Sequence, residues 1–233
     1  HSLGTPWHGQ NIGTLGNIGC FSFQSYKLVN AGEGGILITD DPEVYARAVI
    51  MSGAYEHNWK SHAGVEEAYQ RWQNLLPLYN MRLQNLSAAL IRPQLAEVPR
   101  RVADGRRNHD HLAAKLNAIN GFRVPPPLEP ERRAPDSLQF LLEGYSEDDA
   151  RSFAAVCKKA GLSVQIFGLS PDNARAFWNW GFLPETFELP RTKAMLMRAC
   201  DVRLPARLTL DEVDQIADVL IGSAALLKEP TAA

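Results

Sequence analysis

The sequence has 233 residues, of which 45% are hydrophobic and 21% are charged. These proportions are those of a globular protein with a real core, and they exclude a disordered chain. The 24 Lys and Arg residues nearly balance the 26 Asp and Glu residues. Without an excess of positive charge, the chain is not expected to bind nucleic-acid phosphates by counterion release. We therefore expect no nucleic-acid partner.

Apolar runs in this sequence are far shorter than the roughly 20 residues that span a bilayer, so we expect no membrane partner. The sequence has three cysteines, an odd number, and they are far apart: Cys20, Cys157 and Cys200. They predict neither a disulfide framework nor a zinc cluster, and the histidines lack a third ligand at a metal spacing. A reducing cytoplasm and a metal-free site are therefore expected.

The first 60 residues predict turns, two strands and a helix. Residues 1–19 carry five glycines, which favour turns. Residues 20–23 and 35–39 have the aromatic and β-branched content of strands. Asp41 and Pro42 then open a helix that should end near residue 52, with Asp41 as its N-cap.

The middle of the chain predicts an irregular connection followed by a long helical region. Residues 55–76 show no clean hydrophobic period, whereas residues 83–119 place leucines and valines at helical spacing. Pro93 and Pro99 should bend or interrupt this region, and a hinge between domains fits there.

The last part of the chain predicts a small α+β domain. Three short strands are expected, at 122–124, 137–142 and 163–166. Ser146, with Asp149 three residues later, should cap a helix that ends at Gly161. A final amphipathic helix should begin at Leu210.

Lys27 is the centre of the most informative motif. It follows a strand and the hydroxyl residues Ser22 and Ser25, and the glycine-rich run 32–35 comes after it. A lysine that binds a carbonyl cofactor needs rigid placement and partial desolvation, with hydroxyl and backbone N–H groups nearby to hold a phosphate. A surface lysine beside a glycine hairpin gives the same pattern, so the spacing alone leaves both interpretations open.

Four motifs in chain order resemble the DegT/DnrJ/StrS sugar aminotransferases, which are pyridoxal-phosphate (PLP) enzymes of fold type I. They are the glycines and Asn-Ile of 13–19, the run 22–40 around Lys27, the segment 79–95 with Tyr-Asn-Met-Arg-Leu and Gln-Leu, and the ending 204–212. The resemblance implies an α/β, aspartate-aminotransferase-like fold. Residues 1–95 would be the C-terminal part of the large PLP-binding domain, and residues 96–233 the small C-terminal α+β domain.

The same resemblance implies roles for single residues. Lys27 would bind PLP covalently and move the proton during transamination, and Ser22 would bind the cofactor phosphate. Asn80 would reach the phosphate of the neighbouring subunit's cofactor in a homodimer, whereas Arg82 is expected to be structural. His1 falls where the family contacts the phenolic oxygen of the cofactor, and a terminal histidine without a role fits equally well.

The substrate is less well defined than the cofactor. Where the family has a substrate-facing histidine, residues 167–173 read Phe-Gly-Leu-Ser-Pro-Asp-Asn. The aromatic run 177–180 could stack on a nucleobase or sugar, although packing in the core is the simpler expectation.

The resemblance implies transfer of an amino group from glutamate or glutamine to a keto-sugar, which we expect to be nucleotide-linked. A dehydratase that uses the amine form of the cofactor is an alternative that Lys27 argues against, and a non-catalytic binding or regulatory module is another. Because the first residue is His1, the sequence is expected to begin in mid-protein. We therefore expect that the 233 residues alone do not form an active enzyme.

Overall fold

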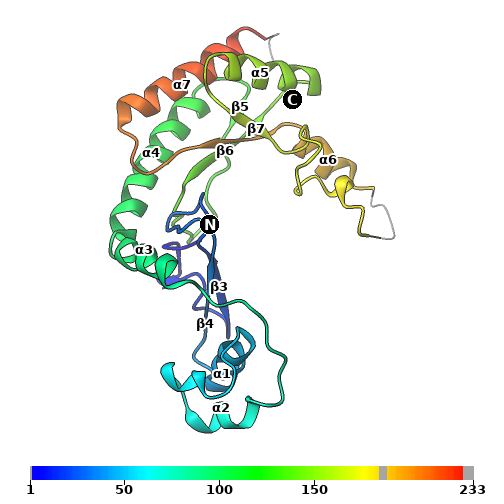
Figure 1. The fold of residues 1–233 in the computed structure, drawn as a ribbon. Coiled ribbons are helices and arrows are strands. Elements are labelled where there is room, and N and C mark those ends of the chain that lie inside the picture. Colours follow the sequence, from blue (N-terminus) through cyan, green and yellow to red (C-terminus); the bar gives the residue numbers. More distant parts are fainter. Residues whose placement is uncertain (1, 184–187, 228–233) are drawn as a thin grey trace. The chain divides into compact units, whose positions relative to one another are not determined.

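The computed structural model describes residues 2–183 and 188–227. The chain forms two compact units: unit 1 comprises residues 1–102 and 127–134, and unit 2 comprises residues 103–126 and 135–233. The division falls within one helix, a few residues beyond the boundary expected at 95, and the short segment 127–134 returns to unit 1. Figure 1 labels helices and strands of both units.

Unit 1 begins with two antiparallel hairpins. Strands β1 (Pro6–Trp7) and β2 (Gln10–Asn11) form the first, as the glycine-rich start predicts for a region of turns. Both of its loop residues, His8 and Gly9, have positive φ, which a type I′ turn requires. Strands β3 (Gly19–Ser22) and β4 (Gly35–Ile38) form the second, within one residue of the predicted strands. The mainly parallel sheet of a large PLP-binding domain is not represented among these described strands.

Helix α1 (Pro42–Met51) confirms the predicted cap. The Asp41 carboxylate accepts hydrogen bonds from the backbone N–H groups of Glu43 and Val44, and Pro42 occupies the first turn. A short polar side chain therefore satisfies N–H groups that a helix start leaves unpaired.

Residues 55–76 are not irregular throughout, so that prediction is wrong. They contain the 3-10 helix η1 (Asn58–Ser61) and helix α2 (Glu66–Trp72). Trp59 and Tyr69 are buried and stacked, with ring centroids 5.0 Å apart, in a cluster with Ile50 of α1. Helices this short have too few turns to show a hydrophobic period in the sequence. Only their packing in the structure reveals which face is apolar.

Helices α3 (Asn85–Ala96) and α4 (Val98–Asn117) replace the single predicted helical region. Pro93 lies inside α3 and does not interrupt it. The break comes at Glu97 instead, and Pro99 falls in the first turn of α4, where its missing N–H leaves no intrahelical bond unmade.

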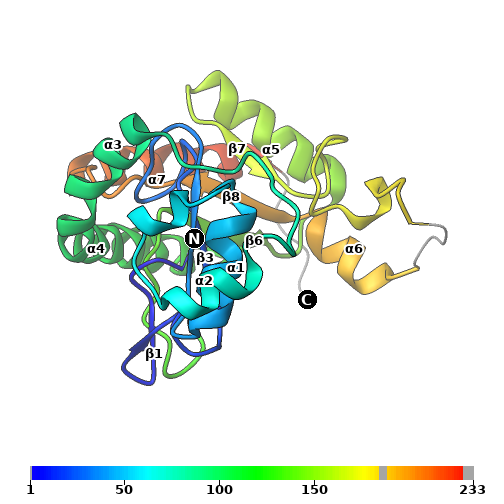
Figure 2. The ribbon, with the colours of Figure 1, turned by 60° about the horizontal axis from the view of Figure 1, so that its bottom comes forward.

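Unit 2 confirms the predicted small α+β domain. Its sheet has the order β5-β6-β8-β7 and is antiparallel throughout. The strands are β5 (Phe122–Arg123), β6 (Ser137–Leu142), β7 (Val164–Ile166) and β8 (Ala199–Arg203). The unit also contains most of α4 and the helices α5 (Glu147–Lys159), α6 (Pro190–Leu196) and α7 (Leu210–Ala225), with the 3-10 helix η2 (Phe177–Asn179) (Figure 2).

The structure confirms the predicted helix signals of α5 and adds a central strand and a helix to the predicted elements of unit 2. Ser146 and Asp149 form the predicted capping box of α5, and Gly161 with φ 87° follows that helix. Strand β8 and helix α6 were not predicted, although β8 pairs with both β6 and β7.

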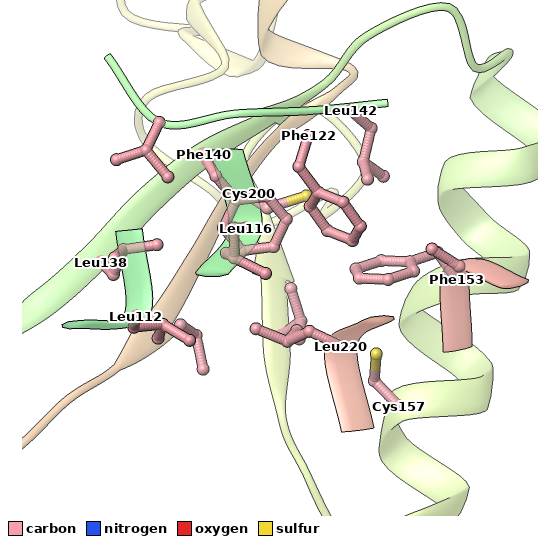
Figure 3. Packing of buried hydrophobic residues seen from close by; sticks show 14 of the residues in the cluster. Leu112, Leu116, Phe122, Leu138, Phe140, Leu142, Phe153, Cys157, Cys200 and Leu220 are labelled. Atoms are coloured by element: carbon pink, nitrogen blue, oxygen red, sulfur yellow. The ribbon is translucent and has the colours of Figure 1, made fainter. Parts of the chain in front are cut away.

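The core of unit 2 lies between the sheet and its helices. The rings of Phe122, Phe140 and Phe153 lie close together, with ring centroids 5.5–6.2 Å apart. Figure 3 shows these side chains. Cys157 and Cys200 lie in the same buried cluster, where burial raises the pKa of both thiols. Because only the thiolate is reactive, these two cysteines act as packing residues.

Candidate functional site

Lys27 lies at the closed end of the hairpin that β3 and β4 begin. Beyond the strands, backbone pairing continues from the N–H of Phe23 to the carbonyl of Gly34 (2.8 Å) and from the N–H of Ser25 to the carbonyl of Gly32 (2.8 Å). The backbone N–H of Lys27 then donates to the carbonyl of Gln24 at 2.9 Å, and Lys27 is half-buried. The lysine thus stands on a tight, hydrogen-bonded turn and not on a loose surface loop.

The glycine run after Lys27 has a steric reason. Gly32 and Gly34 have φ of 85° and 143°, a region that L side chains rarely adopt. A Cβ on Gly34 would also lie 2.8 Å from a terminal methyl group of Leu83. Glycine is therefore strongly favoured at both positions of the hairpin.

Ser22 is the last residue of β3 and is exposed. Its hydroxyl oxygen accepts a hydrogen bond from the backbone N–H of Gln24 at 3.3 Å. A hydroxyl that accepts such a bond still has its own proton to donate to an anion. Ser22 and Lys27 lie in the same hairpin. The hydroxyl donor of Ser22 and the amine of Lys27 are five residues apart.

Asn80 is anchored to another part of unit 1. The N–H groups on either side of it, those of Tyr79 and Met81, donate to the carbonyls of Met51 and Ser52 at the end of α1, at 2.9 and 3.0 Å. Asn80 itself is exposed. Its backbone is therefore fixed while its side chain remains accessible.

Arg82 has the structural role expected for it. Its guanidinium donates to the carbonyl of Gly53 at 2.8 Å and lies 5.8 Å from the ring centroid of Tyr55. Gly53 follows the C-cap of α1 and has φ of 119°, so Arg82 binds the backbone just beyond the helix end.

Two residues that the sequence reasoning gave no site role bind the Lys27 loop. The side chain of Gln94 pairs with the backbone of Asn30, and the guanidinium of Arg101 donates to the carbonyl of Leu28. The only sequence signal for either is that Gln94 belongs to one of the four family-like motifs. His1, in contrast, lies outside the described residues.

The aromatic run 177–180 does not pack in the core, so that expectation is wrong. Trp180 is exposed and stacks on Phe182, with centroids 5.9 Å apart, and Trp178 is half-buried beneath the ammonium of Lys193. Its side chains therefore remain partly accessible.

The described residues contain no group of three metal-ligand side chains close enough to hold an ion. Nor does any helix in that part of the chain combine the length and apolar character needed to cross a bilayer.

Solved structures with the same fold define the class of this chain. The aminotransferase PseC of Helicobacter pylori, involved in the biosynthesis of pseudoaminic acid, has a TM-score of 0.80 at 17% identity, covering 97% of this chain and 58% of that one. A structure of 3-amino-5-hydroxybenzoic acid synthase has a TM-score of 0.75 at 24% identity, covering 95% and 58%. The fold is therefore that of fold type I, the aspartate-aminotransferase-like class of PLP enzymes.

The family is settled by sequence. The model of the DegT/DnrJ/EryC1/StrS aminotransferase family matches residues 1–221, and the chain belongs to that family. The 3-amino-5-hydroxybenzoate synthase of Amycolatopsis mediterranei (strain S699) is 29% identical over 191 residues, which are 81% of this chain and 47% of that protein. GDP-perosamine synthase of Escherichia coli O157:H7 is 28% identical over 118 residues, 51% of this chain and 30% of that protein. The chain spans about half the length of such relatives, or less.

Proposed function

We propose that the protein is a PLP-dependent aminotransferase that moves an amino group from glutamate or glutamine to a keto-sugar, which we take to be nucleotide-linked. The observation that carries the proposal is the placement of Lys27, half-buried on a hydrogen-bonded hairpin in a chain of this family. The relatives add support, since one is named a GDP-perosamine synthase.

The residues of the hairpin suit such a cofactor. A primary amine on a fixed backbone can bind an aldehyde, and a hydroxyl five residues earlier can donate to a phosphate dianion. Pyridoxal phosphate, when bound, supplies the electron sink for the reaction. In this proposal Lys27 holds the cofactor and moves the proton at the reacting carbon, and Ser22 binds the phosphate. His1 would contact the phenolic oxygen.

Lys27→Ala tests the assignment. We expect the variant to fold, since Lys27 is not part of the core, and to lose transamination altogether because a methyl group cannot bind the aldehyde. Cofactor titration of the wild-type protein should produce a visible absorbance band that borohydride removes, with a matching mass shift on the peptide containing Lys27. Lys60→Ala, at an exposed lysine of the same unit, is the control.

Turnover by purified Lys27→Ala would refute the proposal. A wild-type protein that binds no cofactor would favour the non-catalytic module instead. The dehydratase alternative has some structural support, because E. coli GDP-4-keto-6-deoxy-D-mannose-3-dehydratase shares the fold, with a TM-score of 0.76 at 21% identity. Release of water from the sugar without transfer of nitrogen would identify that reaction, and a panel of nucleotide-linked keto-sugars with glutamate and glutamine would identify the substrates.

The proposed assembly is a homodimer in which Asn80 completes the phosphate site of the partner subunit. Its support is the exposed side chain on an anchored backbone. Asn80→Asp should weaken cofactor binding, because it places a negative charge against the phosphate. Mixed dimers of Lys27→Ala and Asn80→Asp should regain one working site, since each intact residue then comes from a different subunit. Mixed dimers without activity would contradict the shared site.

We also propose that the protein is located in the reducing cytoplasm. Cys157 and Cys200 are buried as free thiols and Cys20 is a free exposed thiol, as expected of a chain that does not depend on disulfides.

A further inference from the structure

The backbone just after Lys27 is bound by a side chain from α3. The amide oxygen of Gln94 accepts a hydrogen bond from the N–H of Asn30 at 3.3 Å, and its amide nitrogen donates to the carbonyl of Asn30 at 2.7 Å. One carboxamide therefore occupies both backbone groups of a single residue, as a neighbouring β-strand would. These contacts are partly buried.

Arg101 of α4 fixes both this carboxamide and the loop. Its guanidinium donates to the carbonyl of Leu28 at 2.7 Å and to the amide oxygen of Gln94 at 3.1 Å. The amide nitrogen of Gln94 meets a second carbonyl, that of Leu90, at 2.8 Å. Donors therefore surround the amide oxygen and acceptors surround the nitrogen, which allows only one orientation of the Gln94 side chain.

The loop is also held from within. The side-chain amide of Asn30 donates to the carbonyl of Lys27 at 3.2 Å. Val29, between the two bound residues, is 1% exposed and packs with Ile91 of α3. Ile91 and Gln94 are three residues apart, so one face of α3 supplies both the apolar and the polar contact.

We propose that Gln94 and Arg101 are positioning residues that fix the backbone carrying Lys27. The inference rests on the proposed function, because it matters for catalysis only if Lys27 is the reacting amine. An amine that must both bind a carbonyl and move a proton has to be held to within about 0.5 Å, and a misplacement of 1 Å can lower the rate about a hundredfold. The long, flexible side chain of lysine cannot supply that precision unless its backbone is fixed.

Gln94→Glu is the sharpest test, because the side chain keeps its size while it loses its donor and gains a negative charge. A carboxylate oxygen would then face the carbonyls of Asn30 and Leu90. Gln70→Glu is the matched control, since Gln70 lies on the exposed surface of α2 with its amide bonded to Glu66. For the arginine, Arg101→Met is compared with Arg100→Met, because Arg100 is paired with Glu97 at an exposed position.

Two readouts are needed. Amide hydrogen exchange of residues 25–32 in the cofactor-free protein should accelerate roughly three- to tenfold in Gln94→Glu and Arg101→Met. The kcat of the same variants should fall about 10- to 100-fold, whereas KM for the keto-sugar should change less than threefold, since neither residue is proposed to touch that substrate. Arg101→Lys, which keeps one donor and the charge, should recover part of kcat. The controls Gln70→Glu and Arg100→Met should leave both the amide exchange and kcat unchanged.

The outcomes separate this inference from the proposed function. Normal exchange and normal kcat in Gln94→Glu and Arg101→Met, with Lys27 still essential, would overturn the positioning role alone. Dispensability of Lys27 would overturn the function, whatever the exchange rates. Should Gln94→Glu fail to fold, Arg101→Met decides: normal exchange and normal kcat in that variant would equally overturn the inference.

Discussion

Replacing Ser22 by alanine should weaken cofactor binding far more than it disturbs the protein. Among the described residues the Ser22 hydroxyl accepts a hydrogen bond from the N–H of Gln24, and at 3.3 Å in an exposed setting that bond is weak. Its loss should lower the free energy of unfolding by no more than about 0.5 kcal/mol. The hydrogen bond proposed between this hydroxyl and the cofactor phosphate is a different matter, because its acceptor is charged.

A hydrogen bond to a charged group contributes about 1.5–3 kcal/mol, and each 1.4 kcal/mol is a factor of ten in Kd. We therefore expect the Kd for pyridoxal phosphate to rise about 10- to 150-fold in Ser22→Ala, while kcat at saturating cofactor changes only a few-fold. The measurement is an absorbance titration of the cofactor-free protein. Ser25→Ala, which removes a hydroxyl that donates to the carbonyl of Gly32 in the same hairpin, is the control. An unchanged Kd in Ser22→Ala would refute the phosphate-binding role.

Two further predictions concern unit 2. Hydrogen bonds from Lys115 and from His111 lower the pKa of Asp214, so its contribution to stability is present above the ordinary Asp pKa of about 3.9 and is lost as pH falls through the lower folded value. Asp214→Asn should accordingly flatten the acid side of the stability profile in urea unfolding between about pH 5 and 2, and an unchanged slope would contradict the pairing. Phe140→Ala should lower the free energy of unfolding by about 3–5 kcal/mol, because Phe140 is 1% exposed among aromatic rings. Phe182→Ala, at an exposed ring, should change it by less than about 0.5 kcal/mol, and equal losses would show that the core is misassigned.

The sequence was most informative where structure is decided locally. The caps at Asp41 and Ser146 were predictable because a cap binds N–H groups only two or three residues away. Ser22 and Lys27 could be placed close together for the same reason, since both lie in one hairpin with its glycines. The small α+β domain followed from short elements that carry their own start and stop signals.

Features that depend on distant residues were not predictable in this way. Gln94 and Arg101 bind the Lys27 loop across 64 and 73 residues of sequence, and no spacing rule indicates such a contact. Strand β8 carries Asp201 in its centre, which is atypical of a buried strand, yet that carboxylate accepts a hydrogen bond from the hydroxyl of Ser137 in β6. The strand becomes recognisable only beside its partners.

The place of β8 also has a consequence for biosynthesis. It is the last strand of the described sheet to leave the ribosome, although it lies between β6 and β7. Until residues 199–203 have emerged, β7 lacks the only strand that it pairs with in that sheet, and β6 has an open edge. Open strand edges pair readily with other chains, so the nascent protein must pass through an interval in which aggregation competes with folding. A ribosome that stalls before residues 199–203 have emerged would extend that interval, and we expect chaperone dependence to peak there.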